Sequence, residues 1–199
     1  MHEGMQGELR LTALERRVRG YISEKRFLHT LGVRDTALRL CDMYGCSKEK
    51  AEIASLLHDA ARDIPVESMR KLLKERGVWS EEYEPISRNP LLLHAPAGRV
   101  IASSDFGIED EELLRSIELH TTGGNCMQLL EKVIFVADFI EPGRSFRGVE
   151  TARRLSSRSL DETIFYIYKF TLRNLLMREL FICKNTLLGY NEVVLRLHR

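Results

Sequence analysis

Apolar residues recur along almost the whole chain at intervals of three and four positions, the spacing of one face of an α-helix. Leu14, Val18 and Ile22 form one such series, and Val33 and Ala37 begin the next. No segment combines strand-length alternation of apolar and polar residues with a hairpin dipeptide. The pattern therefore predicts an all-α fold, built as a helical bundle.

Capping residues and helix breakers indicate where these helices begin and end. Thr12 followed by Glu15 has the spacing of a capping box, so we expect residues 1–11 to be a flexible N-terminus and residues 12–199 to form a single domain. Gly45 is a candidate left-handed C-cap, and Ser47 can cap the helix that ends at His58. The predicted helices are 12–22, 29–44, 47–58, 65–77, 94–106, 110–120, 129–140, 150–156, 161–179 and 186–198, with a loop at 77–91.

Composition favours one globular domain without a strong overall charge. The chain has 199 residues, of which 44% are hydrophobic and 30% charged, and its formal net charge is +1. Such a balance gives no global attraction to nucleic acid or to an anionic membrane, and we read local basic clusters such as Arg153–Arg154 as solvated helix faces. No apolar run approaches the roughly 20 residues that span a bilayer, and no signal-peptide pattern opens the chain. We therefore expect a cytoplasmic protein.

The four cysteines do not form a metal site by themselves. They lie at positions 41, 46, 126 and 183, and no two have the C-x-x-C spacing of a thiolate zinc site. Cys41 and Cys183 have apolar neighbours and are expected to be small core residues. In a cytoplasmic protein all four thiols would be reduced.

The candidate chemistry begins at the pair His58–Asp59, which ends an apolar run. Burying these polar groups costs several kcal/mol unless partners satisfy them. Four further residues at or near predicted helix ends could be those partners: His29, His94, His120 and Asp138. Imidazole and carboxylate are ligands for iron, manganese or zinc. A single histidine at such a position is more often an ordinary core or surface residue, so spacing alone leaves both interpretations open.

Five segments resemble, in order, the motifs of the YqeK-type HD-domain phosphohydrolases, the family of symmetrical bis(5'-nucleosyl)-tetraphosphatases. They are RFLHTLGV at 26–33, LLHDAAR at 56–62, LLHAP at 92–96, IELHTTG at 117–123 and VADFIEPGR at 136–144. The similarity covers roughly residues 14–195. It implies an all-α HD fold, symmetrical cleavage of diadenosine tetraphosphate into two ADP, and iron as the metal.

On this resemblance we expect His29, His58, Asp59 and Asp138 to bind one divalent metal ion. Asp59 has two oxygens and could bridge to a second ion, which His94 and His120 would then bind. In a one-metal site the same two histidines would contact phosphate directly. Asp59, His94 and His120 are accordingly the candidate catalytic residues, and one or two metal ions remain possible.

Phosphate needs fixed positive charge and hydrogen-bond donors. The candidates are Arg26, Arg62, Arg144, Thr121, Thr122 and Gly123 with the adjoining Gly124 backbone. Each has a plainer interpretation: Arg26 as a surface residue, Arg62 as the ion-pair partner of Asp63, and the threonines as a helix-ending turn.

The expected chemistry is attack by a metal-activated hydroxide on a central phosphorus, because a divalent ion lowers the pKa of its water toward neutrality. One alternative is an HD nucleotide phosphohydrolase of other specificity, such as a nucleoside monophosphatase. A non-catalytic nucleotide-binding module and a purely structural helical protein are further alternatives. The apolar stretch 164–172 packs either on the core or on a second copy, so a homodimer is possible.

Overall fold

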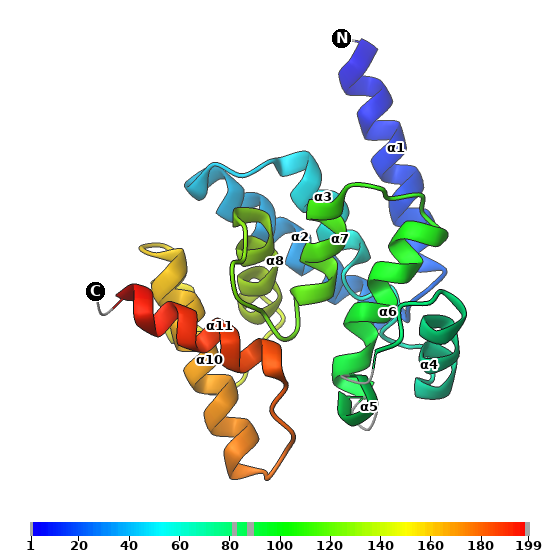
Figure 1. The fold of residues 1–199 in the computed structure, drawn as a ribbon. Coiled ribbons are helices and arrows are strands. Elements are labelled where there is room, and N and C mark those ends of the chain that lie inside the picture. Colours follow the sequence, from blue (N-terminus) through cyan, green and yellow to red (C-terminus); the bar gives the residue numbers. More distant parts are fainter. Residues whose placement is uncertain (1, 81–82, 87–89, 198–199) are drawn as a thin grey trace.

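The computed structural model describes residues 2–80, 83–86 and 90–197. Within these residues the chain forms eleven helices and no strand, which confirms the all-α prediction (Figure 1). The helices are α1 His2–Arg19, α2 Glu24–Tyr44, α3 Lys48–Leu57, α4 Val66–Glu75, α5 Tyr83–Ile86, α6 Pro90–Ser104, α7 Glu111–Leu119, α8 Leu129–Ile140, α9 Val149–Ser156, α10 Leu160–Met177 and α11 Lys184–Leu197. The predicted last residue of the final helix, His198, lies outside the described residues.

Helix α8 is the centre of the core, and its bounds are those the sequence predicts. It is apolar on nearly every side, and Val133, Ile134 and Ala137 have no exposed surface. Helices α2, α7 and α10 pack around it, with α10 and α11 at one end of the molecule and α4–α6 at the other (Figure 1). A helix that is apolar all round is stable only when neighbours cover it on several faces.

Three of the predicted helix ends are confirmed by their hydrogen bonds. Gly45 ends α2 in the left-handed conformation, at φ 80°, and its amide donates to the Cys41 carbonyl. The Ser47 hydroxyl accepts from the Lys50 amide at the start of α3. Asp110 accepts from two amides in the first turn of α7. Each cap satisfies backbone groups that the helix itself leaves without partners.

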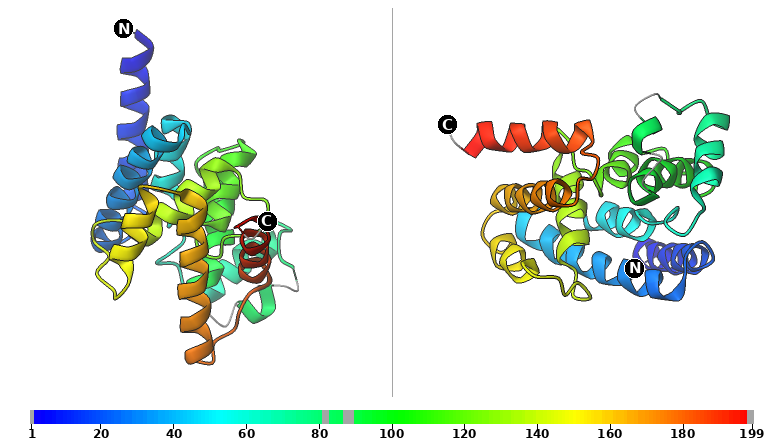
Figure 2. Two further views of the ribbon diagram at one scale, coloured as in Figure 1. Left: turned by 90° about the vertical axis from the view of Figure 1, so that its left-hand side faces the viewer. Right: turned by 90° about the horizontal axis from the view of Figure 1, so that it is seen from below.

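The predicted start of the first helix at Thr12 is wrong, because α1 continues back to His2. Threonine and glutamate are tolerated inside a helix, so a capping-box spacing does not force the chain to leave the helix. The N-terminal part of α1 projects beyond the rest of the molecule (Figure 2). Flexibility of residues 1–11 and the single domain at 12–199 stay predictions.

The predicted loop at 77–91 contains a short helix, α5, and the beginning of α6. Helix α6 starts at Pro90 rather than near His94, so Pro96 lies inside it and not in its first turn. Proline removes one backbone hydrogen bond at that point. Burial of Leu93 and Ala97, neither of which has exposed surface, favours keeping the helix intact across it.

The prediction of reduced thiols is wrong for one pair, since Cys41 and Cys46 form a disulfide. The left-handed turn at Gly45 reverses the chain and brings these two cysteines together. Cys183 is buried, as predicted, and Cys126 is exposed. Among the described helices, none has the length and apolar character required of a membrane span.

Candidate active site

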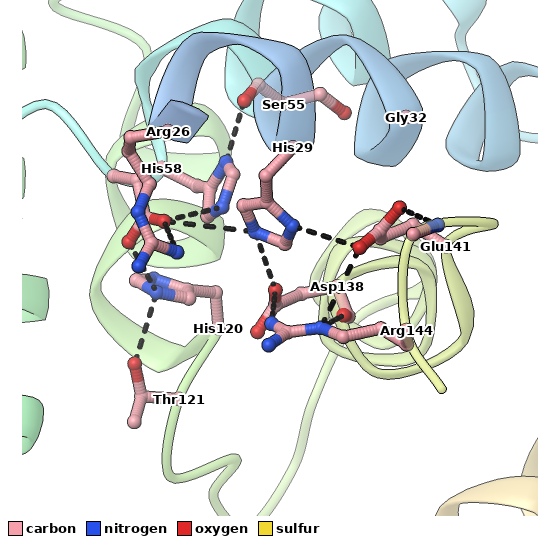
Figure 3. Close-up of polar contacts among 12 residues, drawn as sticks. Arg26, His29, Gly32, Ser55, His58, His120, Thr121, Asp138, Glu141 and Arg144 are labelled. Carbon is pink, nitrogen blue, oxygen red and sulfur yellow. Dashed lines mark hydrogen bonds and ion pairs between the residues drawn. The ribbon is translucent and has the colours of Figure 1, made fainter. Parts of the chain in front are cut away.

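The His58–Asp59 pair lies directly after α3. His58 has no exposed surface and Asp59 only 3%. Helix α2 contributes His29, α6 contributes His94 and α8 contributes Asp138, while His120 follows the last residue of α7. Helices from distant parts of the sequence thus point polar side chains at one place (Figure 3).

The four predicted metal ligands lie close to one another. The Nε2 atom of His29 is 3.0 Å from Oδ1 of Asp138 and 3.6 Å from Oδ2 of Asp59. Nε2 of His58 is 3.4 Å from the same Asp59 oxygen. Two sets of ligand atoms, each within 4.8 Å of one another, share His58: one set with His29 and Asp138, the other with Asp59 and His120.

Hydrogen bonds at Nδ1 orient three of the imidazoles. His58 Nδ1 donates to the Ser55 carbonyl at 2.6 Å, and His120 Nδ1 donates to the Ile117 carbonyl at 2.7 Å. His29 Nδ1 donates to Oε1 of Glu141 at 3.0 Å. We assign the tautomers from these bonds, which leave each Nε2 lone pair facing the site, the usual arrangement of metal-binding histidines.

The buried Nε2 atoms of His29 and His58 have no hydrogen-bond partner among the described residues. Such atoms are costly unless something satisfies them. Two unsatisfied imidazole nitrogens beside two carboxylates therefore fit a divalent metal ion.

His94 and His120 lie on the other side of Asp59. His94 Nε2 is 3.0 Å from Oδ1 of Asp59 and 3.0 Å from Nε2 of His120. The Thr121 hydroxyl is 2.9 Å from the same His120 atom. Asp59 thus faces His29 and His58 with one oxygen and this second pair with the other, so the geometry is compatible with one metal ion or with two.

The site favours ionised carboxylates. Burial raises the pKa of Asp59, but pairing with His58, His120 and His94 holds it well below the usual range. Burial likewise raises the pKa of Asp138, but pairing with His29 and the charge of Arg144 have the larger, opposite effect. The pKa of Asp138 therefore lies below its ordinary value.

His94 is neutral at pH 7, because burial lowers its pKa to about 4. Ionised carboxylates and a neutral imidazole are the forms that bind metal ions.

The three predicted arginines all lie at the site. Nη1 of Arg26 is 3.0 Å from Oδ2 of Asp59, so Arg26 is not merely a surface residue. Arg144 donates to the Asp138 carboxylate at 2.5 Å and to its carbonyl at 2.9 Å.

Arg62 is half-buried, and its guanidinium has no ion-pair or hydrogen-bond partner within the described parts of the chain. Asp63, its expected partner, instead accepts from the Ser23 amide. Burial lowers the pKa of Arg62, while the charges of Asp59 and Asp138 act against that effect.

The prediction that Gly123 and Gly124 offer free backbone donors is wrong. The Gly123 amide donates to the Leu119 carbonyl at 2.8 Å, and the Gly124 amide donates to Oη of Tyr168 at 3.0 Å. Gly123 has φ 60°, and a Cβ there would lie 2.1 Å from Tyr168 Oη. Glycine is therefore required by packing, while the Thr122 hydroxyl donates to the Gly123 carbonyl.

Sequence reasoning missed Glu141. Its side chain is 4% exposed; one oxygen binds His29 Nδ1 and the other accepts from the Gly143 amide at 2.5 Å. A Cβ on Gly32 would lie 2.7 Å from the second oxygen. The signal available was its place three residues after Asp138, at the end of a helix that carries a predicted ligand.

Arg153 was also misjudged, because it is not a solvated surface residue. It donates to the carbonyls of Ile140 at 2.9 Å, Glu141 at 2.6 Å and Arg144 at 2.9 Å. These bonds satisfy the C-terminal end of α8 and hold the turn that carries Glu141 and Arg144.

Comparison with known proteins places this arrangement in a family. The HD domain model matches residues 26–143, more than half of the chain. The chain is 37% identical over 177 residues to the symmetrical bis(5'-nucleosyl)-tetraphosphatase of Bacillus subtilis, covering 89% of this chain and 94% of that protein. It is 39% identical to the protein so named from Halalkalibacterium halodurans, with the same coverage of both chains.

The fold agrees with that assignment. A crystal structure of a predicted HD superfamily hydrolase involved in NAD metabolism, from Clostridium acetobutylicum, matches with a TM-score of 0.88 and 38% identity. The match covers 93% of this chain and 97% of that one. The chain therefore belongs to the HD-domain family and, within it, to the family of symmetrical bis(5'-nucleosyl)-tetraphosphatases.

Proposed function

We propose that this protein is a metal-dependent hydrolase that cleaves dinucleoside tetraphosphates symmetrically, converting diadenosine tetraphosphate into two ADP. The observation that carries the proposal is the cluster of oriented imidazoles beside Asp59 and Asp138. It occurs in a chain that matches tetraphosphatases over nearly their whole length. The names of these relatives indicate the substrate, and the geometry provides residues that could hold the metal ion.

In this proposal His29, His58, Asp59 and Asp138 hold a divalent ion, which we propose to be iron. When bound, such an ion polarises phosphoryl oxygens and lowers the pKa of water, so that a nucleophile exists at neutral pH. His94 and His120 either complete a second ion's ligands or contact phosphate themselves.

The protein's own groups bind and neutralise the phosphate chain. Among the described residues Arg62 has no ion-pair or hydrogen-bond partner, so its guanidinium is the most available of the three arginines for a phosphoryl oxygen. Arg26 and Arg144 each hold a carboxylate and can share their remaining donors with substrate. His94, neutral at pH 7, is proposed to donate a hydrogen bond from Nε2 to phosphate.

The reaction adds one water and breaks one bond. The water oxygen attacks one of the two central phosphorus atoms. The bond breaks between that phosphorus and the oxygen that bridges the two central phosphorus atoms. The bridging oxygen leaves on one ADP and takes a proton, while the water oxygen stays on the other. In-line attack at either central phosphorus gives the same two products.

The test is incubation of the purified protein with ferrous iron and diadenosine tetraphosphate without oxygen, with products resolved by anion exchange and metal measured in the same sample. We expect ADP alone, lost in His58→Ala and Asp59→Ala and retained in Asp42→Ala, which changes a 61% exposed side chain. AMP with ATP, or no product from metal-loaded protein, would overturn the proposal.

The alternatives give different results in the same assay. An HD phosphohydrolase of other specificity would leave the tetraphosphate intact. A nucleoside monophosphatase, for example, would release phosphate from a nucleoside monophosphate added in its place. A binding module would retain nucleotide without turnover. Iron as the metal, the contacts assigned to each side chain, a cytoplasmic location and a homodimer stay predictions.

A further inference from the structure

Two adjoining hollows extend from the Asp138 side of the metal site. The inner one has a volume of about 410 Å³ and is lined by Asp138, Arg144, Phe146 and Phe170. The outer one, about 620 Å³, shares Phe146 and Phe170 and continues to Arg147 and Arg173. We call this continuous surface, defined by Arg144, Phe146, Arg147, Phe170 and Arg173, the aromatic groove. One of its walls is a proposed metal ligand.

The middle of the aromatic groove is a cluster of partly exposed rings. Phe146 and Phe170 have their centroids 5.3 Å apart, and Phe139 packs edge-on against both. Tyr166 stacks on Phe170 and is fixed by a hydrogen bond from its hydroxyl to the Gly148 carbonyl. Rigid rings at the edge of a hollow offer a flat apolar face on which a nucleobase can stack.

Positive charge lies at both ends of the groove. Arg144 is at the inner end, beside the metal site. At the outer end Arg147 and Arg173 are exposed, and neither has an ion-pair or hydrogen-bond partner within the described parts of the chain. Guanidinium groups bind phosphate through paired donors and also stack on aromatic planes. Two such groups, with no partner among the residues that the structure describes, fit an anionic ligand that carries a ring.

We propose that the aromatic groove holds one nucleoside diphosphate half of the substrate, with its phosphates toward Arg144 and its base on Phe146 and Phe170 beside Arg147 and Arg173. This inference rests on the proposed function, because it names where half of that substrate lies. The hollows have the volume of small-molecule pockets, about 300–1,000 Å³. Their charge is complementary to a polyanion at the metal site.

The first test measures binding of ADP, a product that the proposed reaction does not consume. Isothermal titration calorimetry would compare wild type with Arg147→Glu/Arg173→Glu, each with bound metal and after metal removal. We expect roughly tenfold weaker binding in the variant. Arg158→Glu is the matched control, because Arg158 is an exposed arginine before the other end of α10 and does not line the groove.

A second readout reports on the base directly. A tryptophan placed by Phe170→Trp should change its fluorescence when ADP is added, beyond the response of Trp79 in wild type, which is the protein's single tryptophan. Unchanged ADP affinity in the double variant together with a silent tryptophan would overturn the inference. That result would direct attention to the separate hollow of about 260 Å³ lined by Tyr83, Glu118 and Thr122.

The same measurements separate this inference from the proposed function. If wild type converts the tetraphosphate to ADP but neither variant alters binding, only the aromatic groove is wrong. If ADP binds in the groove but the tetraphosphate is not cleaved, the groove stands and the proposed reaction fails.

Discussion

Asp59 separates the imidazoles of the site into two pairs, one at each carboxylate oxygen. His29 and His58 face Oδ2, and His94 and His120 face Oδ1. Residues that act on a metal ion in this way depend on neighbours that fix their direction. The candidate ligands can be identified from the sequence, but the sequence does not show which group orients each of them.

Glu141→Gln should weaken metal binding without removing any ligand. The amide lacks the charge that favours the Nδ1 proton on His29, so we expect affinity for the metal ion to fall about 10- to 100-fold. Titration of metal-free protein with a divalent ion measures this change. Glu49→Gln, an exposed residue in the first turn of α3, is the control. Equal affinities in the two variants would contradict the positioning role of Glu141.

Most of the residues that meet at the candidate site were predictable, whereas the residues that orient them were not. His29 lies next to Glu141 in space but 112 positions away in sequence, and no local spacing predicts such a pair. Arg153 is similar: its basic neighbourhood resembles a solvated face, and only the fold shows that its donors reach the end of α8. Gly123 was given a donor role, but its amide already donates to the Leu119 carbonyl.

At the scale of helices, residues with local effects predicted ends well, and packing decided the others. Ser47 and Asp110 cap helices by contacts within three positions, which sequence alone can indicate. The starts of α1 and α6 depend on how far each helix extends toward its N-terminus, which the local residues permit but do not determine. The polar contacts between α8, α10 and α11 lie beyond local prediction altogether.

An ion-pair network joins these three helices and makes their stability depend on pH. Asp161 of α10 binds Lys132 of α8 at 2.8 Å and Arg196 of α11 at 3.0 Å. Burial raises the pKa of Asp161, but these two partners lower it more, to below its ordinary value of 3.8. The carboxylate therefore stabilises the folded state above that pH, and its contribution is lost as the pH falls through the lower folded value.

Asp161→Asn should accordingly lower the free energy of unfolding by about 1 kcal/mol at pH 7. The difference from wild type should shrink toward zero below pH 3.8. Urea unfolding at a series of pH values measures it. Glu162→Gln, an exposed neighbour in the same first turn, controls for the helix dipole. A deficit that stays constant with pH would mean that the ion pairs do not stabilise this junction.

Close approach of α11 to α10 depends on a glycine. A Cβ on Gly189 would lie 2.0 Å from Oη of Tyr168 and 2.8 Å from the Gly124 carbonyl oxygen. We expect Gly189→Ala to destabilise the protein by about 1–3 kcal/mol, as overpacking does. In a Tyr168→Phe background the same change should cost less, because the hydroxyl is gone. A double-mutant cycle of unfolding free energies measures this coupling, and strictly additive costs would argue against the contact.

At the scale of the molecule, the proposed metal site links three helical regions. Its four proposed ligands come from α2, from the turn after α3 and from α8. Any ion that binds the folded state alone stabilises the whole of it. Global stability and metal content should therefore change together.

Removing the metal should lower the melting temperature. At an ion concentration 100 times the dissociation constant, bound metal adds about 2.7 kcal/mol to the free energy of unfolding. Differential scanning calorimetry with a chelator, and again after restoring the ion, measures the shift. His58→Ala should show no response to either addition. If the chelator leaves the melting temperature of the wild-type protein unchanged, these residues hold no ion.

The hydrogen bonds of Arg153 bear on how the chain reaches this state during synthesis. The HD match ends at residue 143, whereas the arginine that holds its last turn belongs to α9. A nascent chain that has emerged only as far as Gly148 would carry all four histidines of the site, but the carbonyls of Ile140 and Glu141 would lack the Arg153 guanidinium. Folding of the site is therefore expected to be complete only after the ribosome has released α9. The segment that matches the HD model is thus shorter than the segment needed to form the site.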